Sequence, residues 1–461
     1  MGDRAQFVVL PRHYTNTLNM YFGTIPPIAD WTSPFDNIVS SNRYERLRCG
    51  WVRLQQPWGP TTTNGTGGIL NSDGTTNWSD FDLMLQIHTN GVLAAPTRVL
   101  NIIGIAHLTN SIVIPGNGTP VVDQTNSLAD WINDVSLIYS SAAARYRTNF
   151  VYEILNEPGE SWHFSNVTVV AAAMAASASV QAVKSECPDC ITWSPAVQSI
   201  DTPNVGILTN APAPLYYALA DVISWHDGNS YYGPVDVIMT YTNIAWWNWG
   251  STFPWDTEDK AIASVYPGKE LAISEAYPVS PDPLGRSNTW WNNYFSPTNI
   301  PLASWTWYDM STRYWKAIVV WSGNRVRKLL PWLGICNQGE DCYEGWSGNN
   351  SLRANGFGPQ PTLSGNAILG WWLNGAEPVT NWISGTQETW ADAWGGRTGG
   401  VPGLHFFEFQ FGDGTTNTFV WADEDTQITT NFGVGLTDIF SNSWTTAIGK
   451  EPVIAWGWPK R

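Results

Sequence analysis

Short apolar runs alternate with longer segments that favour helix over the first 310 or so residues of the chain. The runs are rich in β-branched and aromatic residues, and most of them end at a polar or turn-forming residue. Such alternation is typical of a parallel α/β fold, in which a helix returns the chain to the same edge of the sheet after each strand. The pattern predicts strands at residues 19–23, 51–58, 99–107, 150–158, 191–194, 222–226, 271–275 and 302–307.

Eight strands of this kind predict a (β/α)8 TIM barrel, which we place in residues 1–377. The clearest helix is expected at residues 169–183, an alanine-rich run with high helix propensity. Residues 312–360 are expected to form an insertion after the last strand, with a helix near 314–330, and residues 363–373 to form the closing helix. Residues 1–15 contain one further apolar run, at 6–10, which we expect to form a strand that pairs with the C-terminal sheet.

The pattern changes after residue 377. Two apolar runs, at 404–411 and 418–422, flank a turn that contains Asp413 and Gly414, and this arrangement predicts a β-hairpin. Further short runs at 427–431, 436–440 and 453–456 follow at similar spacing. We therefore expect residues 378–461 to form a small antiparallel β-sandwich.

Charge and composition narrow the possible partners. The formal net charge is -16 and only 13% of residues are Asp, Glu, Lys or Arg, so we expect no nucleic-acid partner, because phosphates require Lys and Arg. There is no apolar run of 18 residues, and we expect no membrane span. The 29 tryptophans exceed what a core needs, and we expect about half of them to pack internally and the rest to face carbohydrate, whose C–H faces stack on flat rings.

The cysteines and the amino terminus bear on the compartment. Cys187 with Cys190, and Cys336 with Cys342, are candidate local disulfides of an oxidising compartment, with a four-cysteine zinc site as the alternative. We expect a secreted, extracellular protein. The start, Met1-Gly2-Asp3-Arg4, does not lead into the apolar h-region of a signal peptide, so we expect the signal peptide of a secreted protein to have been removed already.

Two of the predicted strands end at a glutamate with a proline within three residues of it, Pro158 after Glu157 and Pro278 after Glu275. Residues 150–158 end in Asn156-Glu157-Pro158, and Glu275 closes the strand at 271–275, 275 − 157 = 118 residues later. The carboxyl ends of barrel strands form one face, so the two carboxyl groups are expected to meet there. Paired carboxylates are the groups that glycoside hydrolysis requires, one as proton donor and the other as nucleophile or base.

The run Tyr-Glu-Ile-Leu-Asn-Glu-Pro at 152–158 resembles the Asn-Glu-Pro signature of the large clan of retaining glycoside hydrolases with a (β/α)8 barrel, clan A. Residues 223–227 are similar to the strand-six histidine segment of that clan, and residues 273–275 to its nucleophile strand. The spacing of Glu153 and the strand-six segment resemble the xylosidase and iduronidase family, whereas Trp51-Val52-Arg53 with Trp58 resembles the cellulase and mannanase family.

The resemblance implies a retaining glycoside hydrolase that acts by double displacement and needs no cofactor. Glu157 would be the acid/base and Glu275 the nucleophile, about 5–5.5 Å apart. It also implies a set of substrate-binding residues at the ends of the other strands. These are Arg53, His107, Asn156, His226, Tyr232 (with Tyr231 as the alternative), Trp305 and Trp307.

The expected substrate is a β-linked polysaccharide or oligosaccharide. Six tryptophans before the last two predicted strands favour an extended cleft and therefore an endo-β-1,4-glycanase acting on cellulose, mannan or xylan: Trp246, Trp247, Trp249, Trp255, Trp290 and Trp291. An exo-acting β-glycosidase is the first alternative. A carbohydrate-binding barrel without activity is the second. Glu153 shares strand parity with Glu157, and we expect it to be a buried hydrogen-bonded group.

Overall fold

The computed structural model describes the elements that build the sheets and the candidate site. It covers residues 19–24, 49–57, 97–103, 128–158, 169–196, 212–227, 262–276, 307–331, 368–382, 404–422 and 435–456, apart from isolated positions within the later ranges, with short pieces at 69–85, 208 and 428–429. No helix in this part of the chain is both long and apolar enough to cross a bilayer. The expected strand at residues 6–10 and the candidate pair Cys336 and Cys342 lie outside the described residues.

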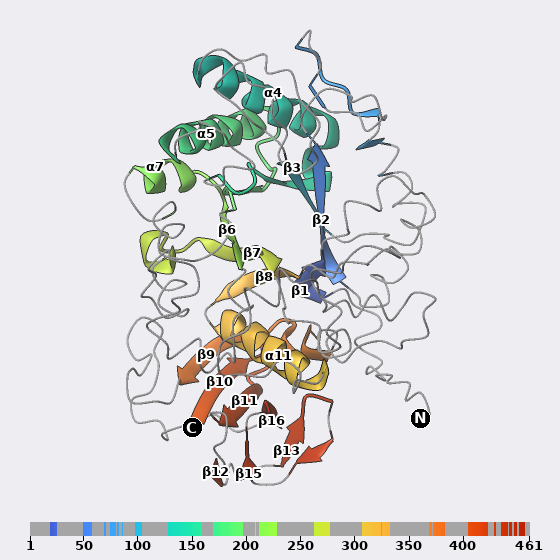
Figure 1. The fold of residues 1–461 in the computed structure, drawn as a ribbon, viewed down its shortest axis with the longest axis vertical. Helices are drawn as coiled ribbons and strands as arrows, with labels where there is room; N and C mark the ends of the chain where they lie inside the picture. Colours follow the sequence, from blue (N-terminus) through green and yellow to red (C-terminus); the bar gives the residue numbers. More distant parts are fainter. Residues whose placement is uncertain are drawn as a thin grey trace, which may run out of the picture.

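Eight parallel strands form the central sheet (Figure 1). They are β1 (Asn19–Thr24), β2 (Cys49–Pro57), β3 (Thr97–Ile103), β4 (Phe150–Glu153), β5 (Thr192–Trp193), β6 (Val222–Asp227), β7 (Glu270–Ala276) and β8 (Val326–Pro331). Each strand pairs with the next one in the sequence, and β8 pairs back to β1 through Leu329 and Phe22. The pairings therefore make a barrel-like ring, and all the carboxyl ends lie on one side of it.

The first seven predicted strands coincide with β1 to β7, but the eighth prediction was wrong. The eighth strand is β8, whereas Trp307 begins the helix α11 (Trp307–Gly323) and residues 302–306 lie outside the described residues. The helix expected near 314–330 is in fact the end of α11 followed by β8, so this part of the supposed insertion belongs to the sheet. Arg325 adopts a left-handed conformation (φ 64°) between the two elements, which turns the chain from helix to strand.

Helices cover the outside of the parallel strands. The described helices are α4 (Leu128–Tyr146), a 3-10 turn (Arg147–Asn149), α5 (Val169–Glu186), α7 (Ala213–Tyr217) and α11. α4 and α5 lie side by side (Figure 1), and the small side chains of Ala142, Ala172 and Ala176 are fully buried there. The predicted helix at 169–183 is confirmed as α5. The small residues that raise its helix propensity also permit this close packing.

The chain after Ala376 forms antiparallel structure. Its strands are β9 (Glu377–Trp382), β10 (Leu404–Gln410), β11 (Thr416–Ala422), β12 (Ile428–Thr429), β13 (Leu436–Asp438), β14 (Ser443–Trp444), β15 (Ala447–Ile448) and β16 (Val453–Trp456). Six of them form one sheet in the order β14-β13-β16-β11-β10-β9, and β12 pairs with β15. The predicted hairpin is confirmed, since β10 and β11 pair antiparallel around the turn at Gly414 (φ 87°).

The antiparallel sheet is joined to the parallel one through α11, which lies between them (Figure 1). Trp315 of α11 packs edge-on against Phe440 with ring centroids 5.4 Å apart, and Lys316 Nζ lies 5.9 Å from the ring centroid of Trp421. Asn417 of β11 donates a hydrogen bond to the carbonyl of Trp372 (2.8 Å). One continuous apolar core therefore extends from the helices around the parallel strands into the antiparallel sheet.

A disulfide joins Cys187 to Cys190 after α5, with Cα atoms 5.3 Å apart. These two sulfurs are therefore bonded to each other and not to a metal ion. The bridge closes a very short loop, so it adds little stability through loop entropy and acts on the local turn that leads into β5.

Candidate active site

The floor of the site is an apolar layer inside the parallel strands. One side chain from each of β2 to β8 contributes to it: Trp51, Val99, Val151, Trp193, Val222, Ala272 and Leu330. Because side chains alternate along a strand, the inward residues two positions further along lie toward the carboxyl ends. Four of those positions hold fully buried polar residues: Arg53, Asn101, Glu153 and Ser224. A layer of polar groups therefore rests on a packed apolar base.

Arg53 is at the centre of this polar layer. Its Nε donates to Glu153 (2.5 Å), its Nη1 is ion-paired with Glu275, and its Nη2 donates to Asn156 Oδ1 (2.7 Å). Burial alone would lower the pKa of Arg53, but the two carboxylates outweigh it and raise the pKa above its ordinary value. The guanidinium is therefore a permanent positive charge on β2 that fixes three side chains: Glu153 on β4, Asn156 just after β4, and Glu275 on β7.

Sequence reasoning placed Arg53 at the end of its strand, whereas it lies in the middle of β2, paired in register with Val99. Its side chain is long and its planar fork carries five N–H donors, so it reaches the carboxyl end of the sheet from this position. The expected convergence with Glu275 and Asn156 is therefore observed although the assumed backbone position was wrong.

The backbone after β4 is strained where it presents Asn156 and Glu157. Leu155 (φ 60°) and Glu157 (φ 50°) both adopt the left-handed region, which costs a non-glycine residue about 1–3 kcal/mol. Two contacts hold this conformation. Glu157 N–H donates to Ala196 C=O (2.8 Å) beyond β5, and the hydroxyl of Tyr139 accepts from Leu155 N–H (2.9 Å) while donating to Glu153 C=O (2.9 Å).

A β-bulge aims Glu275 into the site. In the pairing of β6 with β7, Trp225 lies opposite Ile273 and His226 opposite Glu275, so Ser274 is an extra residue in β7. Ala272 points into the barrel as part of the apolar floor, and strict alternation would turn Glu275 outward. The bulge reverses the alternation, and Glu275 is buried beside Arg53 instead.

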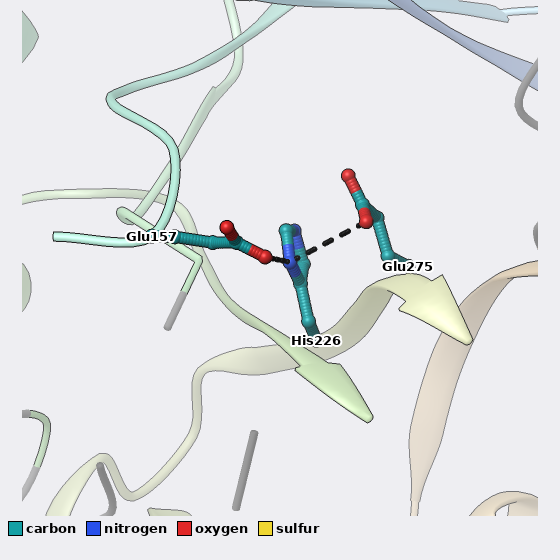
Figure 2. A group of neighbouring side chains, drawn as sticks. All are labelled: Glu157, His226 and Glu275. Carbon is teal, nitrogen blue, oxygen red and sulfur yellow. Dashed lines mark hydrogen bonds and ion pairs between the residues drawn. The ribbon is translucent and has the colours of Figure 1, made fainter. Parts of the chain in front are cut away.

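His226 lies between the two glutamates, as Figure 2 shows. Its Nδ1 is 2.8 Å from Glu157 Oε1 and 3.6 Å from Glu275 Oε2, and its Nε2 is 3.4 Å from Arg53 Nη2. Since an arginine only donates, Nε2 must be the acceptor in that contact, and we assign the proton to Nδ1. His226 then donates to Glu157 and fixes the direction of its carboxyl group.

The carboxyl groups of Glu157 and Glu275 lie close enough to act on one bond. One oxygen of each, together with a nitrogen of His226, lies within 4.8 Å of the other two. Carboxyl groups about 5–5.5 Å apart suit a retaining glycosidase, whereas an inverting enzyme needs about 6.5–9.5 Å to admit a water molecule. Glu157 and Glu275 are only 6% and 3% exposed, so both are largely shielded from bulk water.

Glu157, His226 and Glu275 also form a set of the kind that transition metals accept. One oxygen of Glu275 is, however, already ion-paired with Arg53, whose charge would repel a cation bound at the same carboxylate. We therefore assign no metal to this cluster.

The structure thus brings together five of the residues that the sequence singled out: Arg53, Asn156, Glu157, His226 and Glu275. His107, Tyr231, Tyr232, Trp305 and the six cleft tryptophans lie outside the described residues. Trp307 is the first residue of α11. Tyr139 and Ser224 were missed, because nothing in the residues around them points to the site, and only the fold brings them there.

Comparison with known proteins finds likeness in structure only. No family model matches the chain, and no curated protein matches its sequence. Among the similar solved structures is a family 39 glycoside hydrolase from the gut symbiont Bacteroides cellulosilyticus, 12% identical, with a TM-score of 0.57 over 96% of this chain and 81% of that one. SrfJ from Salmonella typhimurium is 11% identical, with a TM-score of 0.54 over 95% and 89% of the two chains. An endo-β1,6-glucanase is also 11% identical, with a TM-score of 0.51 over 99% and 93%.

These similarities concern the fold: the chain, with its parallel ring of strands and its antiparallel sheet, has an overall architecture similar to that of solved structures that include glycoside hydrolases. At 11–12% identity they establish the fold alone. The role of each side chain must therefore be argued from the geometry of this site.

Proposed function

We propose that the protein is a retaining glycoside hydrolase that cleaves a β-linked polysaccharide by double displacement. Glu157 is the acid/base and Glu275 the nucleophile. The observation that carries the proposal is the approach of these two buried carboxyl groups to within 4.8 Å, with His226 between them. The fold that the chain shares with glycoside hydrolase structures supports it.

The charges around the two groups suit different roles. Three buried carboxyl groups, Glu153, Glu157 and Glu275, surround a single permanent positive charge on Arg53. Keeping all three ionised would bury an uncompensated negative charge, which is costly. Arg53 pairs with Glu153 and Glu275, so Glu157 is the carboxyl group expected to keep its proton in the resting enzyme.

The first step joins the sugar to the enzyme. Glu275 attacks the anomeric carbon while Glu157 donates its proton to the glycosidic oxygen, and the bond to the leaving sugar breaks. Arg53 and His226 hold the two carboxyl groups in line. We assign Asn156 to the 2-hydroxyl of the sugar, because it precedes Glu157 in the chain and is held by Arg53, and because such a contact strengthens in the oxocarbenium-like transition state.

The second step releases the product. Glu157, now ionised, removes a proton from water, and the water oxygen displaces Glu275 from the anomeric carbon with a second inversion. The anomeric configuration is therefore retained. The step uses only side chains, and we assign no cofactor to it.

We propose an endo-β-1,4-glycanase acting on cellulose, mannan or xylan, as the tryptophan-rich segments of the sequence suggest, with exo-acting cleavage of oligosaccharides as the alternative. We further interpret the architecture as a complete (β/α)8 barrel over residues 1–377 with a β-sandwich at 378–461, in a secreted enzyme. The disulfide at Cys187 agrees with an oxidising compartment.

The test is product analysis on a panel of β-1,3-, β-1,4- and β-1,6-linked polysaccharides and aryl β-glycosides, with the anomer followed by NMR. We expect the β-anomer to form first. Glu275→Ala should reduce turnover to background. Glu157→Ala should lower it by about 10²–10⁴-fold on substrates with poor leaving groups. On aryl glycosides with good leaving groups, the glycosyl-enzyme still forms, and azide should accelerate turnover by displacing Glu275 to give a β-glycosyl azide, because azide needs no general base.

Formation of the α-anomer first would contradict the nucleophile role of Glu275. Internal cleavage of long chains would favour endo action, and release of single sugars from chain ends would favour exo action. Binding of a polysaccharide without turnover, unchanged in Glu275→Gln, would instead indicate a carbohydrate-binding protein.

A further inference from the structure

Glu153 is a buried carboxylate for which double displacement provides no role. It is fully buried, it lies four positions before Glu157, and its Oε2 accepts the hydrogen bond from Arg53 Nε at 2.5 Å. Its Oε1 is 3.3 Å from the hydroxyl of Ser224. Within the described part of the chain, Arg53 therefore links this carboxylate to the catalytic pair.

We infer that Glu153 is a positioning residue: its negative charge shares the positive charge of Arg53 with Glu275, and it thereby sets the electrostatic field in which Glu275 and Glu157 act. The inference rests on the proposed function and extends it, because it makes a third carboxylate, Glu153, responsible for the electrostatic environment of Glu157 and Glu275. Glu153 itself touches neither sugar nor water in this role.

The shape of the guanidinium explains why the two carboxylates are coupled. Nε and Nη1 of the same planar group are held by Glu153 and Glu275, so Arg53 cannot turn toward one without leaving the other. A neutral acceptor would have been enough to orient the fork, as Asn156 Oδ1 already does on Nη2. Burying a second carboxylate costs desolvation free energy that a neutral acceptor would not cost. The property that distinguishes Glu153 from a neutral acceptor is its charge, so we assign its role to that charge.

The charged and titratable groups around Arg53 in the described part of the chain come from four strands. They are Arg53 itself on β2, Glu153 and Glu157 on and after β4, His226 on β6 and Glu275 on β7. β3 places the neutral Asn101 in register with Glu153, and β5 places Trp193 there. Removing the charge of Glu153 therefore changes the net charge of this cluster by one unit.

The experiment compares the pH dependence of kcat/KM for the wild-type enzyme and Glu153→Gln. The amide keeps the size of the side chain and an oxygen acceptor for Arg53 but carries no charge. The undivided charge of Arg53 then favours ionised Glu275 at lower pH. With one fewer negative charge nearby, Glu157 also gives up its proton at lower pH. We expect both limbs of the profile to move toward acid by roughly one pH unit, with less than about a tenfold loss of kcat at the new optimum.

Ser224→Ala is the matched control, because it removes the other contact of Glu153 without changing charge. The acidic and basic limbs of the pH profile of Ser224→Ala should remain at the pH values of the wild-type enzyme. If Glu153→Gln lowers kcat or the denaturation midpoint while both limbs stay in place, Glu153 is structural and the inference is wrong. Glu153→Ala provides a second neutral variant, and failure of both to fold would equally assign Glu153 a structural role.

A second readout separates this inference from the proposed function. Carboxyl signals of ¹³C-labelled glutamate can be assigned to Glu157 and Glu275 through their loss in Glu157→Gln and Glu275→Gln. Their titration midpoints should move to lower pH in Glu153→Gln whether or not a substrate has been found. Midpoints that stay fixed would refute the inference, whereas absence of any hydrolysis on the panel would refute only the proposed function.

Discussion

The hydroxyl of Tyr139 joins two backbone groups on either side of Ile154, the C=O of Glu153 and the N–H of Leu155. It replaces hydrogen bonds that a continuing strand would have made, and it does so where the chain enters the left-handed conformation of Leu155. The direction of Glu157 therefore depends on a side chain of α4 as well as on the hydrogen bond from its own N–H to Ala196.

Removal of this hydroxyl tests that dependence. Tyr139→Phe leaves a buried N–H and a buried C=O without their partner, and we expect a loss of about 1–3 kcal/mol in the free energy of unfolding. Because the strained turn is then free to relax, kcat should also fall by about tenfold with little change in KM. Steady-state kinetics and urea denaturation on the same preparation measure both effects.

Tyr152→Phe is the comparison for this change. The hydroxyl of Tyr152, on β4, donates to Arg147 C=O (2.8 Å) on the side of the strand away from the glutamates. Its loss should cost a similar amount of stability and leave kcat unchanged. Equal losses of kcat in the two variants would show that Tyr139 contributes only general stability.

At the level of single residues, the sequence predicted the catalytic groups better than the backbone features and supporting side chains that position them. Glu157 and Glu275 could be proposed because each ends an apolar run at a polar or proline-containing turn. The bulge at Ser274 could not be foreseen, because it depends on pairing between β6 and β7 and not on the residues of β7 alone. Tyr139 and Ser224 likewise reach the site only after the sheet has formed.

Asp221 connects three elements at the amino-terminal side of β6. Its carboxylate accepts from the N–H (2.8 Å) and the hydroxyl (3.1 Å) of Thr192 on β5, and it is ion-paired with Lys184 of α5 (2.8 Å). Burial would raise the pKa of Asp221, but Lys184 and Thr192 outweigh burial and lower the pKa below its ordinary value. The contact therefore stabilises the folded protein when Asp221 is ionised.

The sign of this shift gives a pH-dependent prediction. A carboxyl group whose pKa is lowered by folding adds stability above its unfolded pKa, about 4, and loses that contribution as the pH falls through the folded pKa. Asp221→Asn should therefore be less stable than the wild type at pH 6, and the difference should diminish steadily below about pH 4. Urea denaturation between pH 3 and pH 7 measures it. A difference that does not change with pH would show that the hydrogen bonds to Thr192 matter and the charge does not.

The order of elements was predictable as far as β7 because each strand there is a compact apolar run between polar turns. The error at the eighth strand has a physical cause. Trp305-Thr306-Trp307 has the aromatic and β-branched composition of a strand, yet Trp307 begins a helix that buries Trp315, Ile318 and Trp321 at helical spacing. The strand propensity of these three residues was overridden by the burial of one face of the longer helix. The true eighth strand, β8, was missed because Arg327 and Lys328 weaken its apolar pattern.

For the whole molecule, the continuous core predicts one unfolding transition. Trp421 of β11 is fully buried, stacks on Phe407 (5.1 Å between centroids), and belongs to the same apolar cluster as residues of α4 and α5. Trp421→Ala should lower the free energy of unfolding by about 3–5 kcal/mol. Loss of activity and loss of near-ultraviolet circular dichroism should coincide in denaturant, because both sheets depend on this core.

Leu215→Ala is the corresponding surface change. Leu215 is 77% exposed on α7, and its truncation should alter stability by less than about 0.5 kcal/mol. Two separate transitions in Trp421→Ala, with activity surviving the first, would show that the parallel sheet is stable without the antiparallel one.

The position of α11 between the two sheets also limits how far the chain can be shortened. A fragment that stopped before Glu377 would leave Trp315 and the neighbouring ammonium group of Lys316 without the aromatic surfaces that cover them. Such a shortened fragment would expose the apolar face of α11 to solvent, and we expect it to aggregate on expression. The smallest useful recombinant unit therefore extends to β16, and attempts to graft the carboxylate pair onto a minimal barrel must supply a substitute cover for this helix.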